Sequence, residues 1–262
     1  MILRRIMEHF KDQNWTAVAL DFCIVVVGVF IGIQVANWNE ARTKQIDAAA
    51  ARERLVSDLR ADLDAYAVRW HWYEEVFDAA WRVDDVLRAE EPQEVHAMWQ
   101  FVRDAWIAGG EWPFAPSAQI YKELQNAGDL DLIASGAMQR RLRDYYEDSA
   151  REIEIALTFK SSYVDLTHQL IRGRIGIAMS DCLSAASLEP SQPGTSPDLF
   201  YQDCPPPDNL ALIADSSSSL YRSDALRGAL NARLNRLSGL RSLLGYLDRQ
   251  AASLVSDLEA AP

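Results

Sequence analysis

The hydrophobic pattern of the chain begins with one long apolar run. Residues 17–36 contain a single charged side chain, Asp21. A helix of this length, at about 1.5 Å per residue, matches the roughly 30 Å hydrocarbon core of a bilayer. Trp15 and Trp38 stand at the two ends of the run, where aromatic side chains anchor membrane helices at the interface. The pattern therefore predicts a transmembrane helix over residues 15–38.

The residues before this run have an amphipathic pattern. In residues 1–14 the apolar side chains recur at helical spacing, while Arg4 and Arg5 fall on another face. We therefore expect an interfacial helix over 1–14, in which Arg4 and Arg5 anchor the chain together with Trp15 and Trp38. The apolar run is too long for a secretory signal, and no small-residue cleavage site follows it, so we expect it to remain as an anchor.

One side of the predicted span carries small and polar residues. Gly28 and Gly32 form the G-x-x-x-G pattern, which lets two helix backbones approach closely. Asp21 falls on the same side, and a carboxylate in a membrane helix usually faces a helix partner or a water-filled cavity. Three roles for Asp21 stay open: contact with lipid headgroups, a place in an oligomer interface, and proton transfer. The predicted helix–helix interface comprises Asp21, Val25, Gly28, Gly32, Val35 and Asn39.

Helical spacing also dominates the rest of the chain, and no sustained period-two run indicates a strand. No Gly or Pro lies between Asn39 and Glu91, so the membrane helix is expected to continue outward until Pro92 ends it. The predicted fold class is all-α: one transmembrane helix continues into an antiparallel helical bundle formed by residues 39–262. The expected helices are 40–90, 93–107, about 117–126, 137–179 and 221–258, with Gly128 as a left-handed C-terminal cap.

Two of the expected helices carry apolar residues in alternating steps of three and four. This spacing is typical of coiled-coil-like seams and of helical bundles. The two seams comprise Leu59, Leu63, Tyr66, Trp70, Tyr73, Phe77, Ala80 and Leu87 in the first helix, and Leu237, Leu240, Leu244, Leu247, Ala251, Leu254 and Leu258 in the last.

The cysteine positions bear on the compartment. Cys182 and Cys204 flank a Pro- and Ser-rich segment, whereas Cys23 falls inside the apolar run. A disulfide between the first two would close a loop near 180–208, stabilise the fold by about 3 kcal/mol in the chain-entropy model, and place the domain in an oxidising compartment. The alternative is two unrelated reduced cysteines in a flexible loop. The serine run 216–219 has the composition of a linker.

The charge of the chain disfavours nucleic acid as a partner, and it gives little information on the orientation of the membrane helix. The formal net charge of −12 and the pI near 4.8 argue against nucleic acid, whose binding needs clustered Lys and Arg. Basic residues occur on both sides of the predicted span, so the positive-inside rule gives close to a tie. The cysteine pair decides the orientation: we expect a bacterial inner-membrane protein with its N-terminus in the cytoplasm and residues 39–262 in the periplasm.

Two stretches carry a resemblance to a known family. The opening ILRRIMEHFKDQNWTAVALDFCIVVVGVFIGIQVANWNEAR and the later YKELQNAGDLDLIASGAMQRRLRDYYE resemble a family of bacterial single-span membrane proteins of unknown function. The resemblance implies location and topology, and it implies no activity. The short stretch from Val18 to Phe22 is also similar to the proton-channel subunits of flagellar-type and TonB-type motors, which implies a proton-coupled role for Asp21 as an alternative.

No familiar catalytic pattern occurs in the sequence. The four histidines lack the Glu-x-x-His pairs of a bundle di-metal site, and there is no G-x-S-x-G elbow or Gly-rich phosphate loop. We therefore predict a non-enzymatic protein without a cofactor that oligomerises or binds another inner-membrane protein, in contact with membrane lipid. Two alternatives are a proton-coupled subunit of a membrane motor that uses Asp21, and a metal-dependent helical-bundle enzyme.

Overall fold

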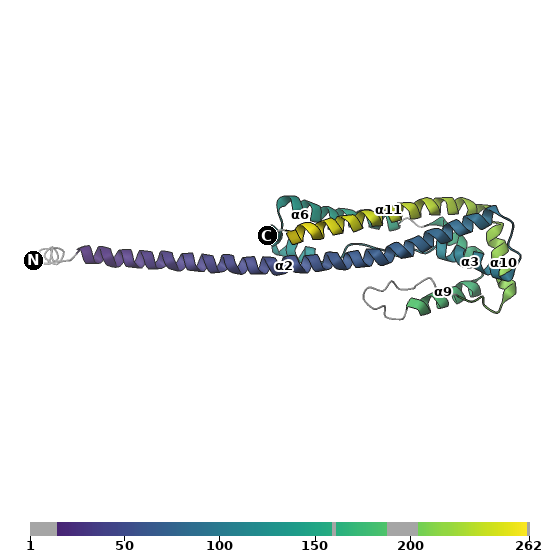
Figure 1. The fold of residues 1–262 in the computed structure, drawn as a ribbon, viewed down its shortest axis with the longest axis horizontal. Coiled ribbons are helices and arrows are strands. Elements are labelled where there is room, and N and C mark those ends of the chain that lie inside the picture. The colour runs from purple at the N-terminus through teal and green to yellow at the C-terminus, as the bar shows by residue number, and fades with distance from the viewer. Residues whose placement is uncertain (1–14, 159–160, 188–203, 261–262) are drawn as a thin grey trace, which may run out of the picture. The chain divides into compact units, whose positions relative to one another are not determined.

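The computed structural model describes residues 15–158, 161–187 and 204–260, and the side chains of all of these except 15–18, 21 and 183–187. Every regular element in these ranges is a helix, as Figure 1 shows. The chain divides into two units, residues 1–52 and residues 53–262. The expected interfacial helix over 1–14 lies outside the described residues.

The described part of the first unit is the beginning of helix α2 (Trp15–Arg88), whose remaining residues belong to the second unit. The expected continuation of the helix past residue 38 is confirmed, because α2 has no break before Arg88. The described part of α2, from Phe22, is long and apolar enough to cross a membrane, judged by length and composition. Its large apolar side chains between residues 20 and 38 are exposed, so no described part of the chain covers them.

The second unit contains the rest of α2 and all the other helices that the structure describes. Helices α3 and α11 fall where the sequence predicts them, and α3 packs against α8 and α10. Pro92 follows the end of α2, as expected. The helices after α2 are α3 (Val95–Ala108), α4 (Gln119–Ala127), α5 (Leu130–Ile133), α6 (Gly136–Arg143), α7 (Ser149–Thr158), α8 (Ser162–Leu170), α9 (Gly173–Ser187), α10 (Leu210–Tyr221) and α11 (Asp224–Ala260), with the π-helical segment η1 (Asp144–Asp148) between α6 and α7.

Helix α11 lies beside the second-unit part of α2 and runs in the opposite direction (Figure 1). Near one end of the pair, Arg60 Nη2 lies 2.5 Å from Glu259 Oε1. At the other end, Arg227 donates a hydrogen bond to the carbonyl oxygen of Leu87. The seam residues predicted on α11 are all buried in the fold. Burial of each leucine stabilises a fold by about 2 kcal/mol relative to an exposed one.

The expected single helix over 137–179 is wrong, because this stretch forms α6, η1, α7, α8 and part of α9. Helix α8 ends where Ile171 adopts an extended conformation (φ −81°, ψ 127°) and buries its side chain. The next amide, N–H of Arg172, donates a hydrogen bond to Ser216 Oγ over 3.1 Å. A contact between residues that are far apart in the sequence therefore stabilises the break between α8 and α9.

The serine run 216–219 is part of helix α10, so the expectation of a linker is wrong. Ser216 and Ser217 are buried. The Ser216 hydroxyl donates to the carbonyl oxygen of Leu212 over 2.7 Å, one helical turn earlier, while it accepts the bond from Arg172. A serine hydroxyl bonded inside its own helix needs no water, which allows Ser216 to lie in the core.

Two glycines of the second unit, Gly128 and Gly110, occupy positions where a side chain would be strained or would clash. Gly128 ends α4 with φ of 75°, which confirms the expected left-handed cap. Gly110 follows α3, and a Cβ atom there would lie 2.9 Å from the ring of Trp72. A side chain at position 110 would therefore displace the buried Trp72.

Candidate functional site

The predicted membrane stripe is open along its described length. Val25 and Val35 are 63% and 57% exposed, and a Cβ atom built on Gly28 or Gly32 would meet no atom within 4 Å. Asn39 is also exposed. In this unit, therefore, no described side chain fills the small-residue groove.

Several predicted membrane residues lie partly or wholly outside the described part of the chain. Trp38 is exposed, and the guanidinium of Arg42 lies 5.9 Å from its ring centre. The side chains of Asp21 and Trp15 are not described, and neither are Arg4 and Arg5. The roles assigned to these four residues therefore stay predictions.

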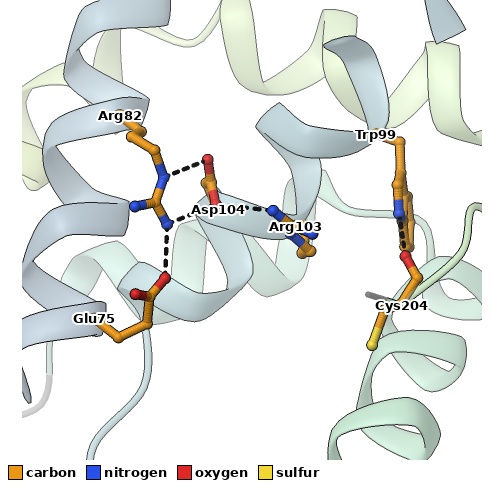
Figure 2. A network of polar contacts seen from close by, with 6 residues as sticks. All are labelled: Glu75, Arg82, Trp99, Arg103, Asp104 and Cys204. Carbon is orange, nitrogen blue, oxygen red and sulfur yellow. Dashed lines mark hydrogen bonds and ion pairs between the residues drawn. The ribbon is translucent and has the colours of Figure 1, made fainter. Parts of the chain in front are cut away.

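Cys182 and Cys204 form a disulfide with their Cα atoms 6.0 Å apart, as the sequence predicts. Cys182 lies within helix α9, so the first residues of the predicted loop 180–208 are helical up to Ser187. The carbonyl oxygen of Cys204 accepts a hydrogen bond from the indole Nε1 of Trp99 over 2.7 Å (Figure 2). The disulfide and this bond together connect α9, the segment before α10, and α3.

A second polar network joins α2 to α3 (Figure 2). Nε and Nη2 of Arg82 bind the two carboxylate oxygens of Asp104 at 2.9 and 3.0 Å, and Nη2 also binds Glu75 at 2.9 Å. The Asp104 side chain is 9% exposed. Hydrogen bonds to this carboxylate raise the pKa of Arg82 above its ordinary value. A two-pronged Arg–carboxylate pair fixes orientation as well as distance, so the network sets how α2 and α3 face each other.

A fully buried arginine closes the end of α3. The Arg233 side chain, on α11, donates to the carbonyl oxygens of Ala108 (2.8 Å) and Gly110 (2.5 Å) and to Glu111 Oε1 (2.7 Å). The Ala108 carbonyl belongs to the last turn of α3 and the Gly110 carbonyl follows it, at the end where the helix dipole favours a cation. Burial lowers the pKa of Arg233 despite the partner carboxylate. The arrangement satisfies a buried charge that would otherwise be costly.

A buried chain of hydroxyl groups ends at Asp62 of α2. The hydroxyl oxygens of Tyr66 and Tyr145 are 2.9 Å apart, and the Tyr145 hydroxyl donates to Asp62 Oδ2 over 2.9 Å. The other carboxylate oxygen accepts the backbone N–H of Ser117 over 2.9 Å. Burial raises the pKa of the Asp62 carboxyl, although both hydrogen bonds oppose this effect. The cluster therefore holds a carboxyl group with a shifted proton equilibrium.

The neighbouring Tyr146 differs from Tyr145 in the hydrogen bonding of its hydroxyl group. Its ring stacks on Tyr121 with the centroids 4.8 Å apart, and the residue is 3% exposed. Among the described residues its hydroxyl has no hydrogen-bond partner. Both Tyr145 and Tyr146 belong to η1, whose wider turn directs two consecutive side chains inward. Segments of π-helix occur often at functional sites, so this cluster is one candidate site.

A cavity of about 350 Å³ lies between α2 and α11, next to the tyrosine cluster. Tyr66 contributes to both, because its ring lines the cavity while its hydroxyl bonds Tyr145. We call this cavity the α2–α11 groove; the residues that border it include Tyr66, Trp70 and His71 from α2 and Gly245, Asp248 and Arg249 from α11. The groove has a volume within the range of small-molecule sites, roughly 300–1,000 Å³.

No protein-family model, curated protein or solved structure matches this chain. The resemblance to the single-span membrane family therefore stays a prediction. Within the described ranges, no three His, Cys, Asp or Glu residues are grouped in a way that could hold a metal ion. His71 Nδ1 lies 3.6 Å from Glu74, and His168 packs on Trp106 with ring centroids 4.9 Å apart.

Sequence reasoning missed the buried polar residues of the second unit. Arg233 and Asp62 occur among many charged residues, and charged residues on a helix are usually solvated. One signal was present for Arg233: it falls between Leu230 and Leu237 on the apolar face of α11. The double tyrosine carried no such signal, because nothing in the spacing of the apolar residues indicates that the helix takes a π-helical turn at this point.

Proposed function

We propose that this protein is a non-enzymatic, single-span inner-membrane protein whose helical domain binds a partner or a second copy of the chain. The observation that supports the anchor is the apolar stretch of α2 up to Trp38. Its side chains are exposed, and they would be costly to leave in water. Insertion of residues 15–38 into a bilayer would satisfy them.

The disulfide supports a periplasmic location for residues 39–262. Disulfides persist in oxidising compartments and are rare in the cytosol. With the domain in the periplasm, the N-terminus lies in the cytoplasm. Cys23 is the remaining cysteine, and it lies in the proposed span.

The stripe Asp21, Val25, Gly28, Gly32, Val35 and Asn39 is the proposed site of helix–helix contact. The open surface at Gly28 and Gly32 supports this, because a second helix packs closely only where no side chain intervenes. In the part proposed to be periplasmic, the packing of α2 against α11 bears on the architecture. The opposed contacts of α2 and α11, together with the buried seam residues of α11, support an antiparallel bundle with coiled-coil-like packing.

Crosslinking in the native membrane tests the association. The wild-type chain is expected to give a dimer or a larger species, or a crosslink to one membrane protein. Gly28→Leu and Gly32→Leu should reduce this product several-fold, because each adds bulk between the helices. Val26→Leu is the matched control, since it adds bulk on the far side of the helix. A wild-type chain that stays monomeric and uncrosslinked contradicts the proposal.

An impermeant thiol reagent tests the topology. In spheroplasts, Cys182 and Cys204 should react only after reduction, and a Cys23→Ala background removes the third thiol. Reaction without a reductant would argue against the disulfide, and protection even after reduction would argue against the periplasmic location.

A further inference from the structure

The α2–α11 groove has an aromatic floor that is held in place from behind. Tyr66 is 2% exposed, and the Tyr145 hydroxyl bonds it. Trp70 lies half-buried beside it, with the guanidinium of Arg241 at 5.3 Å from its ring centre. Arg241 itself lies 3.8 Å from Glu74. Both rings are therefore fixed before anything binds, which lowers the entropic cost of binding.

Trp70 and Arg249 pack closely against Gly245, which lines the groove. A Cβ atom at this position would lie 3.4 Å from the Trp70 ring and 3.4 Å from Arg249 Nη1. The tryptophan and the guanidinium therefore border the same small space. A larger side chain at Gly245 would occupy that space, because helix α11 directs it there.

Among the described residues, the rim of the groove carries one charge of each sign without an ion-pair partner. Arg233 and Arg241 of the same helix lie beside acidic residues. Asp248 and Arg249, in contrast, line the groove and form no hydrogen bond or ion pair within the described part of the chain. A cation and an anion beside an aromatic surface match a ligand that has both charges and an apolar group.

We propose that the α2–α11 groove binds a small zwitterion with an apolar side chain, of the class of the aromatic α-amino acids. The ligand carboxylate pairs with Arg249, and its ammonium group pairs with Asp248. Its side chain packs on Trp70, which lines the groove. A charge-assisted hydrogen bond to a guanidinium supplies orientation as well as affinity.

Titration calorimetry on the full chain in detergent micelles tests this with three probes. L-phenylalanine carries both charges, 2-phenylethylamine lacks the carboxylate, and 3-phenylpropionate lacks the amine. We expect saturable binding of phenylalanine and affinities at least about tenfold lower for each analogue, since each loses one charged pair. No saturable heat with phenylalanine up to about 10 mM, or equal affinity for an analogue, overturns the proposal.

Three variants test which residue pairs with each charged group of the ligand and whether the ligand lies beside Gly245. Arg249→Gln should lower phenylalanine affinity about tenfold and leave phenylethylamine unchanged, whereas Asp248→Asn should weaken phenylethylamine and leave phenylpropionate unchanged. Gly245→Leu should abolish binding. Gly239→Leu is the matched control on α11, because a Cβ atom there meets no atom within 4 Å.

Circular dichroism melting shows whether each variant folds. If Gly245→Leu fails to fold, the two charge variants still decide, because both of these side chains are exposed. Binding that none of the three substitutions changes would place the ligand elsewhere and overturn the assignment.

Discussion

The hydroxyl of Tyr145 lies 2.9 Å from Oδ2 of Asp62, and both residues are buried between α2 and η1. Within the described residues no arginine or lysine forms an ion pair with Asp62, whose hydrogen bonds come from Tyr145 and from the backbone of Ser117. A buried carboxyl group held by neutral donors keeps its proton more readily than one in water. This pair is therefore a place where pH and stability are linked.

Replacement of Asp62 by Asn should flatten part of the pH dependence of stability. Burial raises the pKa of Asp62 above its ordinary value of 3.8, so its contribution is fully present below that value and is lost as pH rises through the folded-state pKa. Asn can accept from Ser117 and donate to Tyr145. Urea unfolding from about pH 4 to about pH 7 should show wild type losing more stability than Asp62→Asn. A gap between the two proteins that does not change with pH would contradict this.

The two adjacent tyrosines should respond oppositely to loss of the hydroxyl. Tyr145→Phe leaves buried Asp62 with one donor fewer and should lower the free energy of unfolding by about 1–3 kcal/mol. Tyr146→Phe removes a buried hydroxyl without a described partner, so it should be neutral or stabilising. Urea unfolding of both variants, side by side, measures the contrast. Equal losses would show that ring packing alone matters at these positions.

Arg233→Met should be strongly destabilising. It leaves the carbonyl groups of Ala108 and Gly110 without their donor, and loss of one partner from a buried charged network costs about 3–5 kcal/mol. Arg60→Met is the control, because Arg60 pairs with Glu259 at the surface and such pairs contribute about 1 kcal/mol or less. The measurement is the urea midpoint and slope of each variant. Similar losses for the two would argue against the capping role.

The serine run offers a matched pair within one helix. Ser216→Ala removes the acceptor of the Arg172 N–H and should cost about 1–2 kcal/mol. Ser217 is equally buried, but its hydroxyl has no partner in the described ranges, so Ser217→Ala should change stability little. Hydrogen exchange at the Arg172 amide should rise in the first variant only. Faster exchange in both would indicate general loosening of α10.

Reduction of the Cys182–Cys204 disulfide should lower stability by about 3 kcal/mol. The effect comes chiefly from the freer unfolded chain, so the double variant Cys182→Ser/Cys204→Ser should behave like the reduced wild type. Thermal unfolding with and without a reductant measures it, and the double variant should show no response to the reductant. A response there would trace the effect to something other than this bond.

Sequence reasoning succeeded where one face of a long helix is uniformly apolar. The leucines of α11 repeat regularly, so burial of that face follows from the spacing alone. The same reasoning failed at Ile171, because the apolar spacing continues across the break and the partner, Ser216, is far away in the sequence. It also missed Arg233 and Asp62, since only the folded chain shows which charged side chains are enclosed.

Because Asp144–Asp148 is a π-helical turn, the tyrosine cluster depends on the number of residues in this segment. A π-turn holds one residue more than an α-turn over the same rise. Deletion of a single codon within 144–148 would return the segment to ordinary helix and rotate α6 by about 100° relative to α7. Tyr145 and Tyr146 could then no longer both keep their present contacts, with Asp62 and with Tyr121. In genetic terms, the cluster should be sensitive to the gain or loss of one codon as well as to substitution.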